Sequence, residues 1–141
     1  MKLSTRGRYG VRALVYIALT EEDGPVAIHT IAERQGISER YLEQLLIPLK
    51  KAGLVKSIRG ARGGYILGRK PEKITMGDII RVLEGPIAPV ECVNEINPDE
   101  CTRADYCVTR KVWSEVRDAI SNILDSYSLY DLAKEQKSLV E

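Results

Sequence analysis

Apolar residues recur at three- and four-residue spacing along the first part of the chain, which indicates amphipathic helices. The pattern predicts a first helix over about residues 6–22, a second near residues 27–35 and a third over residues 39–52. Pro48 lies inside the third segment, so we expect a kink or a shortened last turn there. Because only Gly36-Ile37-Ser38 separates the second and third segments, the two form a predicted helix-turn-helix.

The following segments alternate between apolar and polar residues, as strands do. Residues 54–59 and 64–67 show this alternation, and Gly60-Ala61-Arg62-Gly63 joins them into a predicted β-hairpin. Thr75-Met76-Gly77-Asp78 has the form of a capping box before an apolar run that ends at Gly85-Pro86, which predicts a fourth helix. A helix-turn-helix followed directly by a basic, glycine-tipped hairpin is the arrangement of a winged helix.

The second half of the chain predicts one loop and one long helix. The segment from Pro86 to about Asp105 holds two further prolines and the first two cysteines, so we expect a loop. A long helix starts between residues 104 and 109 and ends near Tyr127, and a short final turn follows Ser128. The apolar stripe of the long helix consists of Val112, Val116, Ala119, Ile120, Ile123, Leu124 and Tyr127.

We therefore expect a mainly α fold with a small β-hairpin: a winged helix-turn-helix DNA-binding domain plus a long C-terminal dimerisation helix. Residues 1–85 form the predicted DNA-binding domain, residues 86–107 a cysteine-bearing cluster loop, and residues 108–141 the dimerisation helix and C-terminal tail. The long helix is expected to pair with its twin in a homodimer, because a dimer reads the two half-sites of a palindromic operator in double-stranded DNA.

The charge distribution supports a DNA partner. The formal net charge is only +1, yet residues 1–73 carry 14 Lys and Arg against 7 Asp and Glu, and residues 74–141 carry 7 against 13. A basic half points to a polyanion. The sequence contains neither an apolar signal-peptide region nor a stretch near the roughly 20 apolar residues that span a bilayer. We therefore expect a cytoplasmic protein with no membrane partner.

The polar face of the third predicted helix supplies candidate base contacts, because the first turns of such a helix face base edges in the major groove. Arg40 can pair with a guanine and Gln44 with an adenine, whereas phosphates repel Glu43 unless it accepts from a cytosine amino group. Ser38 lies on the same face, and Tyr41 can donate to a phosphate. The alternative is an ordinary amphipathic helix with a solvated polar face.

Basic residues on either side of the helix-turn-helix supply candidate backbone contacts. Arg59 and Arg62 flank Gly60 in the predicted wing, where glycine lets the backbone approach DNA while the arginines enter a minor groove. Alone, these arginines would also fit a solvated turn; their position after a helix-turn-helix in a basic half favours DNA binding. The candidates for gripping phosphates near the N-terminus are Lys2, Arg6 and Arg8.

The only three cysteines, Cys92, Cys101 and Cys107, occur in one segment with the spacing C-x8-C-x5-C. An odd, clustered set argues for metal binding or redox chemistry rather than a disulfide framework. Three thiolates can hold an iron–sulfur cluster or, with one more ligand, zinc, while unligated thiols can act as a redox switch. The sequence has no paired acid and base, no glycine-rich phosphate loop and no nucleophile–histidine pair, so we do not expect an enzyme.

The cysteine pattern leaves the fourth ligand open. The sole histidine, His29, lies on the predicted second helix, where a histidine is more often an ordinary surface or core residue. Glu43 of the third helix is another candidate. The carboxylates near the cysteines are Glu91, Asp99, Glu100 and Asp105.

Four segments resemble a known family: KLSTRGRYG from Lys2, SERYLEQL from Ser38, RGARGGY from Arg59 and IIRVLEGP from Ile79. They look like the IscR family of bacterial winged-helix, Rrf-type transcription regulators. That family also contains nitric-oxide sensors and cysteine-metabolism repressors. The resemblance extends over nearly the whole chain.

The resemblance implies a homodimeric regulator, mainly a repressor, of iron–sulfur cluster assembly genes. In cluster-bearing members three loop cysteines hold an iron–sulfur cluster, of the 2Fe–2S type in the cluster-sensing branch, and Cys92, Cys101 and Cys107 match them. Cluster-donor proteins are then candidate partners. The resemblance also places Arg59 in the minor groove and Ser38, Glu43 and Gln44 in the major groove.

The chain departs from the family pattern at several positions. The first cysteine gap is longer than usual, Arg110 stands where the family has a histidine, and Arg8 where the nitric-oxide branch can have an acid. The cysteine-metabolism branch often lacks the cysteines, although residues 84–91 match it closely. The alternative function is therefore a nitric-oxide- or redox-responsive regulator, or a cysteine-metabolism repressor, gated by thiol chemistry or by a partner protein.

Overall fold

The computed structural model describes residues 3–96, 98 and 101–140 of the 141-residue chain. Three short 3-10 helices, η1 (Glu21–Asp23), η2 (Pro71–Lys73) and η3 (Glu91–Val93), lie between the main elements. Among the described helices, none is long and apolar enough to cross a membrane. The main elements are α1 (Thr5–Leu19), α2 (Ile28–Gln35), α3 (Glu39–Lys51), β1 (Val55–Ile58), β2 (Gly64–Leu67), α4 (Met76–Glu84), α5 (Val108–Ser126) and α6 (Leu129–Val140).

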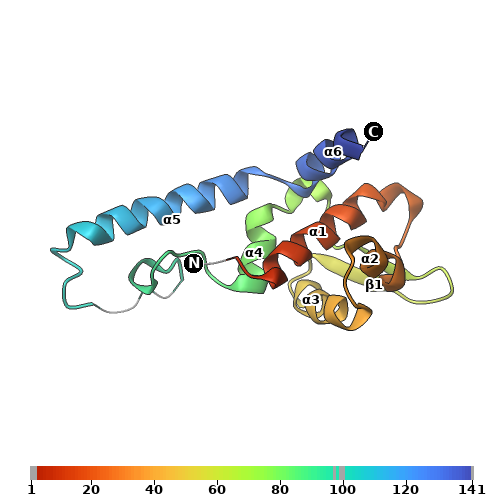
Figure 1. The fold of residues 1–141 in the computed structure, drawn as a ribbon, viewed down its shortest axis with the longest axis horizontal. Coiled ribbons are helices and arrows are strands. Elements are labelled where there is room, and N and C mark those ends of the chain that lie inside the picture. The colour runs from red at the N-terminus through yellow and green to blue at the C-terminus, as the bar shows by residue number, and fades with distance from the viewer. Residues whose placement is uncertain (1–2, 97, 99–100, 141) are drawn as a thin grey trace.

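The expected mainly α fold with one hairpin is confirmed (Figure 1). Strands β1 and β2 pair antiparallel, from Val55 opposite Leu67 to Ile58 opposite Gly64. Helix α2 ends at Gly36, whose φ of 67° is left-handed, and α3 starts only three residues later. The turn that glycine permits here gives the helix-turn-helix its sharp change of direction. Helix α3 continues past Pro48 to Lys51, one residue short of the predicted end.

One apolar core lies between α1, α3, α4 and the base of the hairpin. Its members are spread over all of these elements, so no single helix can keep its position without the others. The largest fully buried side chains are Leu14, Ile17, Ile31, Leu42, Leu45, Leu46, Leu49, Leu54, Ile74, Ile79, Ile80 and Ile87.

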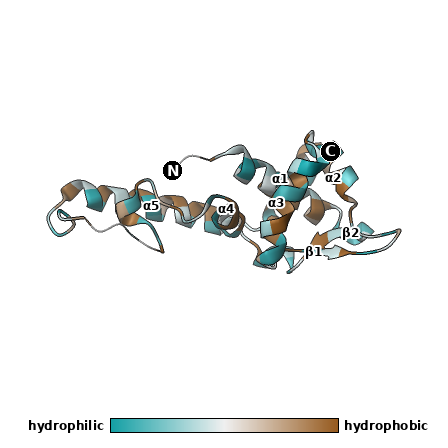
Figure 2. Ribbon diagram, turned by 90° about the horizontal axis from the view of Figure 1, so that it is seen from below, coloured by the Kyte–Doolittle hydropathy of each residue, from teal (hydrophilic) through white to brown (hydrophobic). Residues whose placement is uncertain are grey.

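Helix α5 extends away from this core, as Figures 1 and 2 both show. It has no buried residue, although Figure 2 shows hydrophobic residues at intervals along its ribbon. Val108, Val112, Ile123 and Tyr127 are 77, 47, 60 and 44% exposed. Ile120 and Leu124 of the predicted stripe pack against the core, whereas the described residues leave the rest of the stripe partly or largely uncovered. Because a long helix is stable mainly through the packing of its apolar face, this exposed part is a candidate contact surface.

The chain then returns to the core as helix α6, which packs across α1. The sequence predicted only a short final turn after Ser128, and this prediction is wrong: α6 has 12 residues. Backbone bonds hold its start in place, from Met76 N–H to Tyr127 O and from Leu129 N–H to Ile74 O, both at 2.8 Å. Leu129 is fully buried. These contacts join segments more than 50 residues apart, which local patterns do not reveal.

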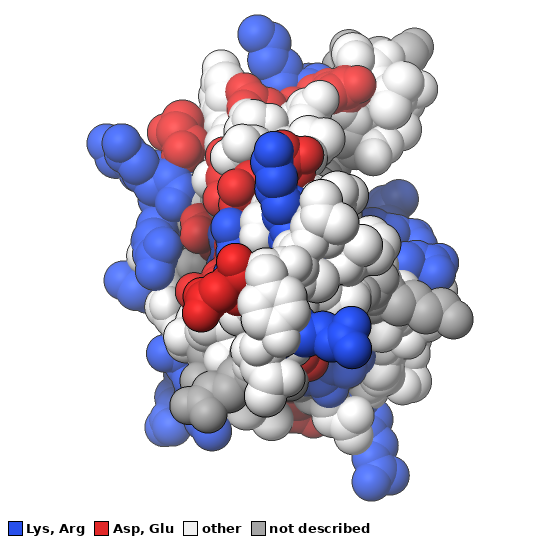
Figure 3. Space-filling model, turned by 90° about the vertical axis from the view of Figure 1, so that its left-hand side faces the viewer, with Lys and Arg blue, Asp and Glu red and all other residues white. Residues whose placement is uncertain are grey.

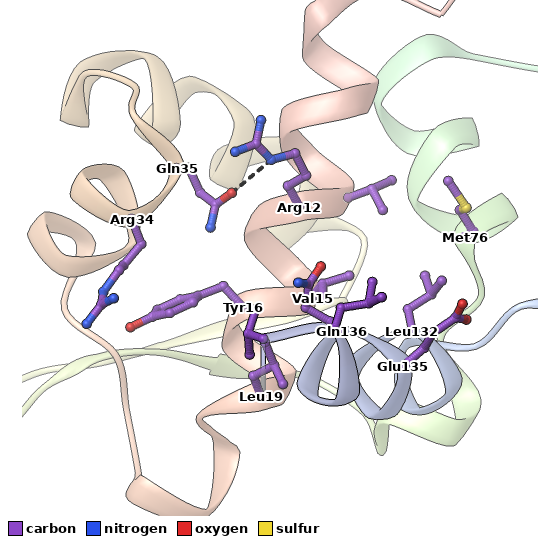
Figure 4. Close-up of a pocket in the computed structure, with 13 residues that line it drawn as sticks. Arg12, Val15, Tyr16, Leu19, Arg34, Gln35, Met76, Leu132, Glu135 and Gln136 are labelled. Atoms are coloured by element: carbon purple, nitrogen blue, oxygen red, sulfur yellow. Dashed lines mark hydrogen bonds between the residues drawn. The ribbon is translucent and has the colours of Figure 1, made fainter.

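An open pocket of about 640 Å³ lies between α1, the end of α2 and α6 (Figure 4). Its floor is apolar and includes Val15 of α1 and Leu132 of α6. Arg12 lies at its edge, where its Nε donates to Gln35 Oε1 at 3.1 Å. The end of α6 thus contributes exposed apolar residues, Leu139 and Val140, rather than core.

Candidate nucleic-acid interface and cysteine loop

Helix α3 buries one face and presents the other to solvent. The side-chain hydroxyl of Ser38 accepts from the Tyr41 N–H at 3.1 Å and caps the helix, so its first turn is fixed. Arg40, Glu43 and Gln44 are exposed on the polar face, as a recognition helix requires. The opposite face consists of Leu42, Leu45, Leu46 and Leu49, each at most 1% exposed.

Tyr41 ties this helix to the start of α1. Its hydroxyl donates to Thr5 Oγ1 at 3.2 Å, and its ring meets Tyr9 edge to face with centroids 6.2 Å apart. A bond from Tyr41 to a phosphate would have to replace the bond to Thr5. Arg6 and Arg8 are exposed on the segment that Tyr41 anchors. Lys2, the third predicted phosphate contact, lies outside the described residues.

The wing has a fixed base and an exposed tip. Val26 exchanges two backbone bonds with Tyr65, at 3.0 and 2.8 Å, next to the start of α2. A Cβ on Gly64 would lie 2.2 Å from the Val26 carbonyl oxygen, so only glycine allows this contact. Gly60 has a φ of 111°, which turns the chain at the tip. The exposed tip residues are Arg59, Gly60, Ala61 and Arg62.

Charges of both signs occupy the side of the molecule where α5 lies. Figure 3 shows Lys and Arg side chains mainly around the edges of this face and Asp and Glu nearer its middle. The view agrees with the acidic second half of the chain, which contributes the loop and α5. This face lacks the unbroken basic surface expected of a nucleic-acid contact.

The three predicted cysteine ligands are spread along the segment between α4 and α5. Cys92 lies on η3, Cys101 in an exposed turn, and Cys107 at the N-cap of α5. All three thiols are free. Within residues 3–96, 98 and 101–140, no three or more His, Cys, Asp and Glu side chains are gathered as metal ligands. The predicted cysteine site therefore stays a prediction, and metal binding would require the loop to close.

The surroundings of the Cys107 thiol favour its thiolate form. Its Sγ lies 3.1 Å from Thr109 Oγ1. Hydrogen bonds from the Thr109 hydroxyl and from the Arg110 backbone N–H lower the pKa of Cys107 below its ordinary value. A lowered pKa at a helix N-terminus is the environment of a metal-binding or oxidisable cysteine.

Two arginines of α5 hold the backbone around Cys92. Arg110 donates to the Cys92 carbonyl at 3.5 Å, and Arg117 donates to the Val93 carbonyl at 3.1 Å. The Nε of Arg110 is buried and has no acceptor in the described part of the chain. This donor lies near Cys92 and Cys107, which Arg110 contacts through its side chain and its backbone N–H. A buried cationic donor in that position suits an anionic group bound through thiolates, so these residues fit a soft metal or an iron–sulfur cluster.

Glu95 anchors the same loop to the rest of the fold. Its two carboxylate oxygens each accept from Arg81 of α4 at 3.1 Å. Ser121 of α5 donates to it at 2.8 Å and the Ile87 N–H at 3.0 Å. The hydrogen bonds from Arg81 lower the pKa of Glu95 to about 2, outweighing burial, which raises it.

Sequence reasoning did not find Arg81, Glu95 or their partner Asp125 on α5. One signal was present: Arg81 is a lone cation within the apolar run Ile79-Ile80-Arg81-Val82-Leu83. A charged residue in such a run is costly to bury without a partner. The identity of that partner depends on tertiary contacts.

The family comparison identifies the protein class. The model of the Rrf2 family, described as iron-dependent transcriptional regulators, matches residues 3–135. The chain belongs to the Rrf2 family. Its fold and its function as a DNA-binding transcription regulator rather than an enzyme are thereby confirmed. Transcription regulators of the Rrf2 family bind DNA and are typically dimeric.

The relatives include proteins named CymR and proteins named IscR. The chain is 50% identical to the HTH-type transcriptional regulator CymR of Bacillus subtilis, over 94% of this chain and 90% of that one. The solved CymR structure, titled as that of the global cysteine regulator, gives a TM-score of 0.79 and covers 96% of this chain and 98% of its own. The T. potens IscR structure gives a TM-score of 0.78 at 48% identity, with 96% of this chain and 88% of that chain covered. IscR of Xenorhabdus nematophila is 40% identical, over 99% of this chain and 83% of its own.

The Arg81–Glu95 pair predicts an acid-sensitive part of the stability. Because the pKa of Glu95 in the folded protein is lower than in the unfolded chain, the contribution is present above about pH 4.5 and is lost as pH falls toward 2. We expect Glu95→Gln to lower the free energy of unfolding at pH 6 by about 1 kcal/mol after solvent screening, and by progressively less below pH 4.5. Urea titrations between pH 6 and 3 measure this difference. A parallel pH dependence in wild type and variant contradicts it, and Glu72→Gln, exposed on η2, is the control.

Proposed function

We propose that this protein is a homodimeric repressor of iron–sulfur cluster assembly genes that senses cluster status through its own cysteine loop. The observation that carries the proposal is the set of three free thiols on a loop that α4 and α5 both hold. The similarity to IscR proteins supports it. Cluster-donor proteins are proposed partners, because the loop lies at the surface.

Cys92, Cys101 and Cys107 would hold the cluster, which we propose to be 2Fe–2S. A bound cluster supplies a group whose presence depends on iron supply and redox state. The chain contributes the lowered pKa of Cys107, which favours the thiolate, and the cation of Arg110, which offsets negative charge beside Cys92. Closing the loop around such a group changes the position of Glu95, and therefore its contact with α4.

For DNA, we propose that α3 enters the major groove and the wing a minor groove. Arg40 and Gln44 would read bases, while Glu43 would disfavour sites that offer it no cytosine amino group. Arg59 and Arg62 at the tip would lie in the minor groove. Arg6 and Arg8, with Lys2, Ser38, Tyr41 and the Gly60 backbone, would position the protein on the phosphates and groove edges.

A second candidate function is a cysteine-metabolism repressor gated by thiol oxidation, nitric oxide or a partner protein. The observation that favours it is the 50% identity to CymR. The free, exposed thiol of Cys101 and the lowered pKa of Cys107 also suit an oxidisable pair. The two candidates share the DNA module and differ in what the thiols bind.

Metal analysis distinguishes the two candidates. After anaerobic purification, we expect iron and acid-labile sulfide in near equal amounts, and the loss of both in Cys92→Ala, because that variant removes one of three thiolate ligands. Thr102→Ala, exposed on the same loop, should keep them. Zinc, or no metal, in wild-type protein would overturn the cluster proposal and leave the thiol-gated repressor.

Two arginine variants test the assignment of base and phosphate contacts. On a duplex selected from a randomised pool by the wild-type protein, Arg40→Ala should cost about 1–3 kcal/mol and relax the base preference at one position. Arg8→Ala should weaken binding to selected and random duplexes alike and reduce the salt slope by about 1. Fluorescence anisotropy at several salt concentrations measures both. Equal losses on both duplexes for Arg40→Ala would remove it from the base-reading set.

The apolar stripe of α5 provides a test of the proposed dimer. Ile123→Glu places a charge on that stripe and should give a monomer, with at least about tenfold weaker binding to the selected duplex, because the second half-site contact is lost. Asn122→Glu adds the same charge about 100° around the helix, away from the stripe, and should remain a dimer. Light scattering after size exclusion gives the mass. A dimeric Ile123→Glu would mean that another surface forms the dimer.

A further inference from the structure

The cysteine loop and the start of α1 both contact α4, at residues one turn apart. The start of α1 and helix α3 together are called the DNA-binding edge below. Arg81 faces the loop and α5, whereas Glu84 faces the start of α1. Figure 1 shows α4 near the middle of the molecule, with the loop and α5 on one side and α1 and α3 on the other. The apolar residues of the same helix, Ile79, Ile80 and Leu83, are 0, 2 and 7% exposed, so α4 can move only as a unit with the core.

On the loop side, Arg81 binds two carboxylates at once. It donates to both oxygens of Glu95 at 3.1 Å, and to both oxygens of Asp125 at 2.6 and 3.0 Å. A Cβ on Gly77 would lie 1.9 Å from Asp125 Oδ1, so glycine lets α5 approach α4 this closely. Paired, doubly bonded carboxylates fix the guanidinium in one orientation.

On the DNA side, Glu84 caps the start of α1. One carboxylate oxygen accepts from the Ser4 N–H at 3.1 Å, from the Gly7 N–H at 2.9 Å and from the Ser4 hydroxyl. Burial alone would raise the pKa of Glu84, but these hydrogen bonds outweigh it and hold the pKa below its ordinary value. A carboxylate at a helix N-terminus also meets the positive end of the helix dipole.

The start of α1 then contacts the recognition helix. Thr5 Oγ1 accepts from Tyr41 of α3, and Tyr9 packs against the same ring. Arg6 and Arg8 lie on this segment. Hydrogen bonds therefore join Glu95 to Arg81 at one point of α4 and Glu84 to the start of α1 at another, and the helix itself connects the two points. The start of α1 in turn contacts α3.

We propose that Arg81 and Glu84 are positioning residues that transmit the position of the cysteine loop to the DNA-binding edge. Any movement of Glu95 changes its hydrogen bonds to Arg81 and therefore shifts the position of α4. Because α4 is a rigid helix, Glu84 moves with it and alters the hydrogen bonds to the start of α1. The regulatory meaning of this relay rests on the proposed function. The mechanical coupling exists without any group bound to the cysteines.

Hydrogen exchange of the metal-free, full-length protein tests the coupling directly. Glu95→Gln keeps the shape of the side chain and removes its charge, and the hydrogen bonds of Glu95 to described residues go to Arg81, Ile87 and Ser121 rather than to α1. We expect amide exchange at Gly7 to become at least about fivefold faster in Glu95→Gln, in the same direction as in Glu84→Ala, which removes the cap itself. Glu72→Gln, a matched change on exposed η2, should leave exchange at Gly7 unchanged.

Binding to the selected duplex supplies a second readout. If the two residues act through one relay, Glu84→Ala with Glu95→Gln should bind within about twofold of Glu84→Ala alone, rather than with the product of the two losses. Ser121→Ala removes one donor to Glu95 and is the milder variant if Glu95→Gln folds poorly. It should speed exchange at Gly7 less, and in the same direction.

Faster exchange confined to the loop, with Gly7 unchanged, would overturn the relay and make Glu95 a local anchor. Multiplying losses in the double variant would do the same. Neither result depends on iron, so a protein without a cluster can still confirm the relay. Conversely, a cluster-bearing protein with unchanged exchange at Gly7 would keep the proposed function and discard the relay.

Discussion

The close approach of α1 to α4 is the constraint on which the remaining arrangement depends. Two glycines, Gly7 and Gly10, lie three residues apart on the face of α1 that meets α4. A Cβ on Gly10 would lie 2.1 Å from Leu83 Cδ1, and one on Gly7 would lie 2.7 Å from Glu84 Oε1. Glycine within a helix costs about 1 kcal/mol relative to alanine. The core contacts and the carboxylate cap that this approach allows offset that cost.

The elements packed around α1 and α4 bury their apolar side chains, whereas α5 leaves several of its own exposed. The DNA module contributes most of the core, in which Leu14 and Leu45 are fully buried, and Leu129 of α6 completes it. Helix α5 joins that module through Asp125, which binds Arg81, and through Ile120 and Leu124, which pack against the core. It leaves Val112, Ile123 and Tyr127 exposed. An exposed apolar stripe of this kind often marks a contact site for another molecule. The proposed assembly surface therefore lies on the helix that begins at the cysteine loop, so a change in the loop and a change at that surface would act on the same helix.

Local patterns were sufficient to predict the elements that local interactions form. The Thr75–Asp78 capping box is present with both of its bonds, at 2.9 and 3.0 Å, and Ser38 caps α3. Helix α6 was missed because its position depends on Leu129 reaching the core and on backbone bonds to Ile74 and Met76, far away in the sequence. The candidate DNA contacts could be proposed from the sequence because they lie on one polar helix face and in one turn. The Arg81 and Glu84 contacts were not, since their partners lie 14 and 80 residues away.

Arg110 limits what the cysteine loop can bind. A guanidinium stays protonated in proteins and has no lone pair to donate to a metal, so Arg110 cannot act as a ligand at the position where the family has a histidine. Instead its buried Nε has no acceptor in the described residues while its terminal nitrogen holds the Cys92 carbonyl. A metal group on this loop would therefore have three thiolates, with its remaining position filled from outside the cysteine set. If a carboxylate or a solvent molecule fills that position, the group is bound less tightly than by four thiolates, and such lability would suit a sensor better than a structural site.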